Sequence, residues 1–364
     1  MSSPGNRFPS VEDLPARAAL PDPLLRAEGT RIASPESWRD HRATLLDLLL
    51  HYEYGHLPPA GAAVQATPVS MRRLDARGGS GASGAPGAIG AIDAIERTLR
   101  LGMGPRHDVI ADLVLTLPAT TRGPLPVIVR GDLGWAPVKP EIAAMVVERG
   151  YALVEFNREQ IAGDGPARDG VYLAYPQFDG GRIAAWAWGF HRVLDWLCVQ
   201  DDFDPQRIIA TGHSRGGKAA LLAGATDTRI ALTVPNDSGC GGAGCFRILG
   251  PGSEDLAAIL DRFPYWFHSR LRDFVGRAER LPFDQHTLKA LIAPRALFTT
   301  EARGDLWANP EGTLRTHEAA QPVFDMLGAS DRIAIHFREG GHEHNADDWS
   351  ALLDCADAKL PLRR

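Results

Sequence analysis

From about residue 109 onward, short runs rich in branched apolar residues alternate with segments of helical periodicity. This alternation constrains the fold most, because strand, helix and strand in succession produce a mostly parallel sheet with helices on both faces. The expected strands are 110–117, 127–130, 151–156, 208–211, 231–235, 296–300 and 333–337. The expected helices are 140–149, 183–199, 215–225, 311–327 and 346–359. The sequence therefore predicts an α/β protein.

The remaining segments set the predicted domain organisation. Residues 1–30 are expected to form an N-terminal arm, and a helix is expected to begin at Pro35. Residues 31–364 are expected to form a single domain. Within it, the Gly-, Ala- and Ser-rich segment 76–94 is predicted to be a flexible surface loop. The long interruption at 250–289 is predicted to pass over the carboxyl edge of the sheet, near the active site.

Charge and cysteine content exclude several classes of protein. The net charge is −6 with both signs interspersed, which argues against a broad basic face for nucleic acid and against attraction to an anionic membrane. No apolar run approaches the ~18 residues of a membrane span. The four cysteines are too few for a disulfide scaffold and lack the paired spacing of a zinc site.

The N-terminal residues and the cysteines also bear on the compartment. No apolar core of a secretory signal is visible, so we expect either a cytoplasmic protein or the mature form of an exported one. Cys240 and Cys245 are expected to be free thiols in a reducing cell and to form a small disulfide only after export. A monomer is expected.

A nucleophile motif lies between a predicted strand and a predicted helix. Residues 212–216 read G-H-S-R-G, a G-x-S-x-G pattern that directly follows the strand 208–211. In this context the turn holds Ser214 in a strained conformation, and a Cβ at either glycine would collide with a neighbouring element. The N–H of Arg215 and the helix N-terminus point toward the position where an oxyanion would develop. Ser214 is the predicted nucleophile.

A serine nucleophile needs a base, and a histidine base needs a carboxylate to orient it. Around a G-x-S-x-G elbow, the chain order is serine, acid, histidine. His342 follows the last predicted strand and is the predicted base, with His344 as the neighbouring alternative. A metal site at these two histidines is the weaker interpretation, because the chain lacks the H-E-x-x-H spacing. We expect no metal or organic cofactor.

Two carboxylates compete for the third place. Asp237 follows the strand 231–235, and Asp305 follows the strand 296–300. Both therefore lie at carboxyl ends of strands, where open α/β sheets carry their active sites. Chain order does not choose between them, so both remain candidates.

Two cations lie beside the predicted nucleophile. Arg215 is adjacent to Ser214. Lys218 lies four residues after Ser214 and therefore on the same helical face as the serine. Cations at a helix N-terminus oppose the macrodipole by ~0.3–1 kcal/mol each, so this placement needs a reason. Both side chains could simply be solvated. We favour a pocket that meets an oxygen-rich or anionic substrate.

Several longer stretches carry a family resemblance. They are HYEYGHLPP (51–59), IAAWAWGFHRVLDWL (183–197), GHSRGGKAALLAGA (212–225), NDSGCGGAG (236–244), FPYWF (263–267), LPFDQHTLKALIAPRALF (281–298), GDLWANPEG (304–312) and REGGHEHNADDW (338–349). In their order and number they resemble the glucuronoyl esterases, the 4-O-methyl-glucuronoyl methylesterase family, particularly its bacterial branch. The resemblance spans roughly residues 20–355.

The resemblance implies an α/β-hydrolase fold, which is a three-layer sandwich. It also implies an enzyme that cleaves the ester between 4-O-methyl-glucuronic acid on xylan and alcohols of lignin. It implies these roles: Ser214 as nucleophile, His342 as base, Arg215 at the oxyanion, Lys218 and Glu254 at sugar hydroxyls, and Trp307 beside the uronate. Asp237 stands where many members carry the triad glutamate, and Asp305 matches an alternative acid of bacterial members. His213 replaces the cysteine of fungal members, so their disulfide cannot form here.

The main hypothesis is a serine esterase that acts through a Ser-His-Asp triad and an acyl-enzyme on a small-molecule or oligosaccharide uronate ester. One alternative keeps the triad but takes an acetyl xylan or another carboxylic ester. A further alternative is a carbohydrate-binding protein on a catalytically silent hydrolase scaffold. The intact serine, histidine and twin acids argue against the last.

Overall fold

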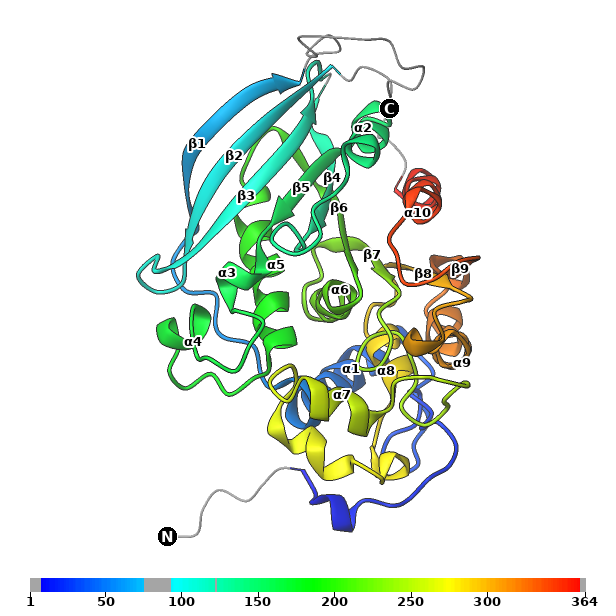
Figure 1. Ribbon diagram of the computed structural model, residues 1–364. Coiled ribbons are helices and arrows are strands. Elements are labelled where there is room, and N and C mark those ends of the chain that lie inside the picture. Colours follow the sequence, from blue (N-terminus) through cyan, green and yellow to red (C-terminus); the bar gives the residue numbers. More distant parts are fainter. Residues whose placement is uncertain (1–7, 75–92, 122, 361–364) are drawn as a thin grey trace.

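A nine-stranded sheet forms the centre of the residues that the computed structural model describes, 8–74, 93–121 and 123–360 (Figure 1). Its strands are β1 (Gln65–Leu74), β2 (Ala94–Met103), β3 (Val109–Pro118), β4 (Leu125–Arg130), β5 (Ala152–Phe156), β6 (Phe203–His213), β7 (Ile230–Asn236), β8 (Ala296–Ala302) and β9 (Ile333–Arg338). They lie in the order β1-β2-β3-β5-β4-β6-β7-β8-β9. The pairs from β5 through β9 are parallel, and those from β1 to β5 are antiparallel. The predicted mostly parallel sheet is confirmed.

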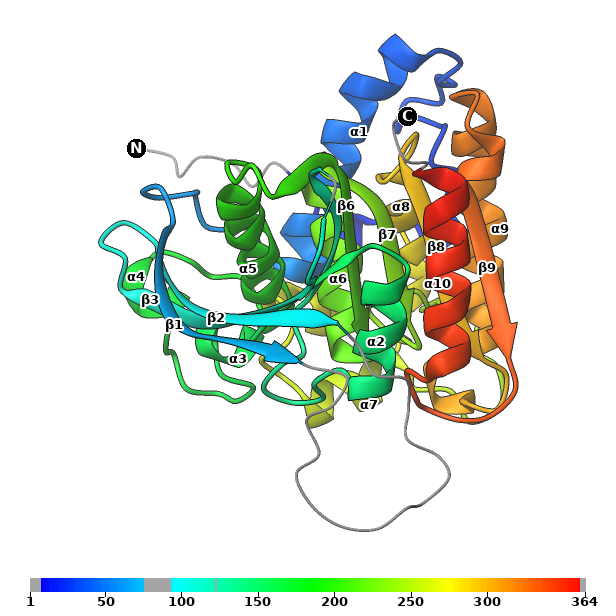
Figure 2. The same cartoon turned by 90° about the horizontal axis from the view of Figure 1, so that it is seen from above.

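Helices cover both faces of the sheet (Figure 2). One face carries α2 (Pro140–Glu148) and α10 (Ala346–Lys359), and the other carries α5 (Arg182–Leu197), α6 (Arg215–Thr226) and α9 (Pro310–Met326). In β4, Val127 and Val129 pack into one apolar cluster and Ile128 into the other. Because side chains alternate across a strand, a strand buried on both faces reads as one continuous apolar run. The predicted three-layer arrangement is therefore confirmed.

The first long helix begins where the sequence predicts it. α1 (Pro35–Leu49) has Ser34 as its N-cap, and it continues into the wider turn η2 (Leu50–Tyr54). Gly55 ends this turn at φ 79°, where a Cβ would collide with the backbone of Gly180. Only glycine fits this position.

The antiparallel strands β1 and β2 are absent from the sequence prediction. Most positions of β1 are exposed, so its sequence lacks the apolar alternation by which a half-buried strand is recognised. The predicted flexible loop 76–94 lies outside the described residues, apart from Asp93 and Ala94. Ala94 begins β2.

The predicted excursion at 250–289 contains α7 (Leu256–Arg262), η3 (Ser269–Phe274), η4 (Ala278–Arg280) and α8 (Gln285–Ala290). The described part of the N-terminal arm, residues 8–30, packs against it. The backbone N–H of Arg17 donates to the carbonyl of Glu279 over 2.7 Å, and Arg280 Nη1 donates to the carbonyl of Leu14 over 2.6 Å. The arm therefore supports the segment that supplies one wall of the pocket described below.

The described residues include further short helical turns: η1 (Val11–Asp13), α3 (Arg158–Ile161), α4 (Val171–Ala174), η5 (Leu306–Ala308) and η6 (Ser330–Arg332). Within the same part of the chain, no helix combines the length and apolar character needed to cross a membrane.

Candidate active site

Ser214 lies in the sharp turn between β6 and α6, at φ 54° and ψ −119°. A positive φ is strained for a residue with a side chain, so the surrounding structure must hold it. A Cβ on Gly212 would meet the backbone of Gly216, and a Cβ on Gly216 would meet the carboxylate of Asp132. The predicted strained elbow and the predicted collisions at both glycines are confirmed.

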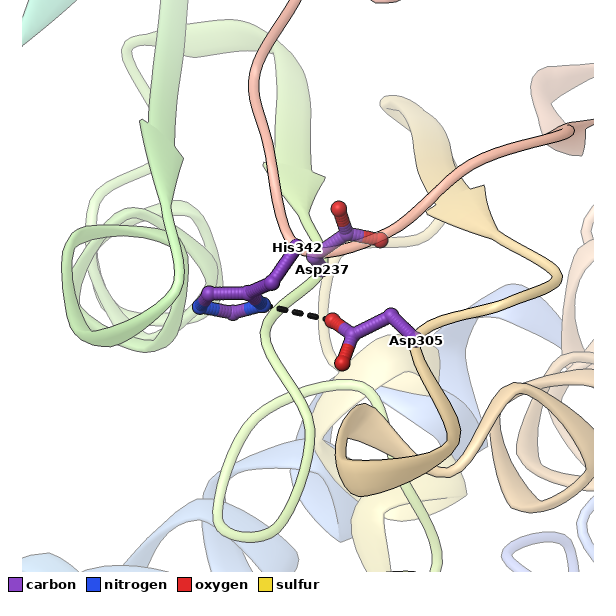
Figure 3. A group of neighbouring side chains, drawn as sticks. All are labelled: Asp237, Asp305 and His342. Atoms are coloured by element: carbon purple, nitrogen blue, oxygen red, sulfur yellow. Dashed lines mark hydrogen bonds and ion pairs between the residues drawn. The ribbon is translucent and has the colours of Figure 1, made fainter.

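His342 lies in the loop after β9, and its ring bonds to a carboxylate (Figure 3). Its Nδ1 is 2.5 Å from Asp305 Oδ2. The His342 side chain is 41% exposed, whereas that of Asp305 is 5% exposed. A carboxylate at Nδ1 fixes the proton on that nitrogen and leaves Nε2 free to accept a proton.

Asp237 directly follows β7 and has different partners. Its carboxylate accepts from the backbone N–H of Ala302 over 2.7 Å and from Arg338 Nη2 over 3.0 Å. Burial raises the pKa of Asp237 to about 7, and the charge of Asp305 acts in the same direction. Of the two acids that the sequence left open, the structure pairs His342 with Asp305.

Asp237, Asp305 and His342 each offer a metal-ligand atom, and these atoms lie within 4.8 Å of one another (Figure 3). All three groups already have partners, since Arg338 binds Asp237 and Asp305 binds the ring of His342. A cation next to a carboxylate satisfies it without a metal ion. The arrangement therefore suits proton transfer better than metal binding.

His344, the alternative base, lies elsewhere. Its ring stacks on Trp349 with centroids 4.8 Å apart, and both ring nitrogens are buried without a hydrogen-bond partner. Burial holds the pKa of His344 well below its usual range. Because it does not reach the pocket beside Ser214, it is poorly placed to act on that hydroxyl.

A cavity of about 230 Å³ opens beside Ser214. Its lining contains seven of the eight predicted site residues: Ser214, Arg215, Lys218, Asp237, Glu254, Trp307 and His342. Asp305, the eighth, contacts the ring of His342 from behind the lining. The volume is below the roughly 300–1,000 Å³ of drug-sized sites, so the cavity suits a compact ligand.

Lys218 brings a buried charge to this cavity. Its Nζ donates to the carbonyls of Ser238 and Cys240 over 2.6 and 2.7 Å, which occupies two of its three donors. Burial lowers the pKa of Lys218 and raises that of Glu254, and each charge opposes the shift of the other. The wall of the cavity thus offers one buried cationic donor and one buried acceptor.

Arg215 is held by aromatic rings that the sequence analysis did not assign to the site. Its guanidinium lies 4.9 Å from the ring centroid of Trp135, 5.3 Å from that of Phe263 and 4.9 Å from that of Trp266. It also forms an ion pair with Asp164. The FPYWF stretch at 263–267 was a signal for two of these rings, whereas nothing near 135 or 164 in the sequence points to Arg215.

Cys240 and Cys245 are separate buried thiols. Burial raises the pKa of both, to about 12 for Cys245, so neither is a reactive thiolate.

The strand, elbow and helix around Ser214, set in a mostly parallel sheet between two helical layers, define the chain as an α/β-hydrolase. Residues 107–328 match the family model described as "Glucuronyl esterase, fungi". The chain belongs to the glucuronoyl esterase family, whose members are carboxylic-ester hydrolases.

Two curated relatives agree with this assignment. Carbohydrate esterase MZ0003 of an unknown prokaryotic organism is 30% identical, over 93% of this chain and 89% of that protein. The 4-O-methyl-glucuronoyl methylesterase of Podospora anserina is 31% identical, over 92% of this chain and 66% of that protein.

Solved structures show the same fold. The glucuronoyl esterase from Solibacter usitatus superimposes with a TM-score of 0.80 at 28% identity, over 96% of this chain and 99% of that chain. A glucuronoyl esterase mutant from Sporotrichum thermophile, in complex with methyl 4-O-methyl-β-D-glucopyranuronate, superimposes with a TM-score of 0.75 at 26% identity. The match covers 95% of this chain and 89% of that chain.

Proposed function

We propose that this protein hydrolyses esters of glucuronic acid and 4-O-methyl-glucuronic acid by acyl transfer through Ser214, His342 and Asp305. The observation that carries the proposal is one cavity in which the elbow serine and the histidine meet a buried lysine and glutamate. The serine and histidine suit an ester carbonyl, and the lysine and glutamate suit sugar hydroxyls. The uronate complex of the Sporotrichum thermophile relative supports this choice of substrate.

In the first half of the reaction, Ser214 Oγ forms a bond to the uronate carbonyl carbon while His342 Nε2 takes the hydroxyl proton. The negative oxygen that develops lies at the N-terminus of α6, beside the cation of Arg215. The bond from carbon to the alcohol oxygen then breaks, and His342 returns the proton to the departing alcohol. Asp305 keeps the ring in the required tautomer and stabilises its charged form.

In the second half, water gives its proton to His342 and attacks the acyl carbon. The bond to Ser214 Oγ breaks, the proton returns to that oxygen, and the free uronic acid leaves. Each half is a general base step followed by a general acid step at the same nitrogen.

Asp237 has a different role in this proposal. Its carboxylate binds Arg338, which also donates to the backbone carbonyls of Gly341 and Glu339 over 3.1 Å each. Asp237 therefore helps to hold the loop that carries His342.

Two esters that differ in the acyl group test the substrate. We expect kcat/KM for benzyl glucuronate to exceed that for nitrophenyl acetate. In Lys218→Met, kcat/KM should fall roughly 10- to 100-fold for the glucuronate, the range of a lost charged hydrogen bond of about 1.5–3 kcal/mol. It should stay nearly constant for the acetate, which has no sugar hydroxyls. Equal loss on both esters, a preference for acetate, or binding of the uronate without turnover would contradict the proposal.

A further inference from the structure

A column of stacked rings, defined here as Trp135, His213, His344 and Trp349, runs past the catalytic groups. Neighbouring ring centroids are 5.8, 6.2 and 4.8 Å apart, with interplanar angles of 8°, 24° and 20°. The ring of His342 contacts this column at His213, with ring centroids 4.4 Å apart and an interplanar angle of 46°. His213 directly precedes Ser214, so a single side chain joins the nucleophile elbow to the loop of the base.

The His213 ring is firmly fixed. Its Nδ1 lies 2.6 Å from Asn236 Oδ1, and Asn236 Nδ2 donates to Thr300 Oγ1 over 3.0 Å. The backbone N–H of His213 donates to Asp132 Oδ2 over 3.0 Å. Because the amide oxygen faces Nδ1, the proton lies on that nitrogen. Burial lowers the pKa of His213 to about 4, so the ring is neutral near pH 7.

His342 has few other restraints. Its side chain is 41% exposed, and Asp305 holds only one edge of the ring. A single hydrogen bond at Nδ1 leaves the ring free to tilt about that bond and to carry Nε2 away from the serine. Contact with the fixed ring of His213, at a centroid distance of 4.4 Å, restricts this freedom.

We propose that His213 is a positioning residue for the general base: its ring packs against the ring of His342 and keeps Nε2 directed at Ser214. This inference rests on the proposed function, since it assumes that His342 is the base. It assigns the contribution to the ring of His213 and not to its polar atoms.

Two variants separate the ring from its polar atoms. His213→Phe keeps a ring but cannot bond to Asn236, whereas His213→Gln keeps a polar group but has no ring. We expect His213→Gln to lower kcat about 10²-fold, as small misplacements of catalytic groups do, with KM nearly unchanged. His213→Phe should stay within about tenfold of the parent in kcat. His213→Asn replaces the glutamine variant if that chain does not fold.

Rates are measured per titrated active site, with the melting temperature recorded for each variant. Equal losses in both variants, a larger loss for phenylalanine, or a kcat that follows melting temperature and not the ring would overturn the inference. The comparison uses any ester that the parent cleaves, nitrophenyl acetate included. Failure of the uronate preference is therefore distinguishable from failure of the His213 inference.

Discussion

Two regions of the molecule differ in the burial of their ion pairs: the carboxyl edge of β7 to β9 and the antiparallel extension of β1 and β2. At the carboxyl edge, Arg338 binds Asp237 and Asp348 with all three side chains no more than 2% exposed. In the extension, Arg72 binds Glu96 over 2.7 Å while the arginine side chain is 67% exposed. Buried pairs are costly to form and more costly to break, whereas exposed pairs contribute little. The costly buried ion pairs therefore lie at the candidate active site.

The largest expected effect is on catalysis at the carboxyl edge. Asp305→Asn should lower kcat about 10³- to 10⁴-fold, because the amide cannot fix the required tautomer of His342. Asp237→Asn should lower kcat far less, because its partners are Arg338 and the Ala302 N–H. Steady-state kinetics on one ester measures both. A larger loss for Asp237→Asn would exchange the roles of the two acids, and a loss under tenfold in both would contradict the triad.

The sequence predicts the parallel part of the fold well, because strands buried on both faces carry strong apolar runs, as in Val127 to Val129. It does not predict β1, whose residues mostly face solvent. The same contrast holds at the site. A local pattern is enough to find Ser214, but the choice between Asp237 and Asp305 depends on side-chain directions from three loops. The aromatic rings around Arg215 likewise come from segments far apart in the chain.

The second expected effect is on stability. Arg338→Met should lower the free energy of unfolding by about 3–5 kcal/mol, because it leaves the buried carboxylates of Asp237 and Asp348 without their cation. Urea denaturation near pH 7 measures this. A loss below 1 kcal/mol would show that the carboxylates find other partners.

A third effect depends on pH. Burial holds the pKa of His344 well below its usual range and those of His213 and His191 near 4. The unfolded chain therefore binds these protons first, and stability should fall as the pH drops from about 6.5 toward 4. His344→Phe keeps the stack on Trp349 but cannot be protonated, so its urea midpoint should fall less between pH 7 and pH 5 than that of the parent. If His344→Phe follows the pH dependence of the parent, the buried ring does not contribute to acid sensitivity.

The smallest effect is expected in the antiparallel extension. Arg72→Met removes the same chemical group as Arg338→Met, but from an exposed pair that solvent screens. The free energy of unfolding should change by about 0–1 kcal/mol, and added salt should reduce the difference. A loss as large as that of Arg338→Met would remove the contrast between the two regions.

The most direct test of the proposed esterase is the kcat/KM of Ser214→Ala for benzyl glucuronate. The parent should cleave this ester, and the variant should lose at least about 10³-fold, because no other group forms the acyl-enzyme. The melting temperature of the variant should match that of the parent. Activity within tenfold of the parent would contradict the account.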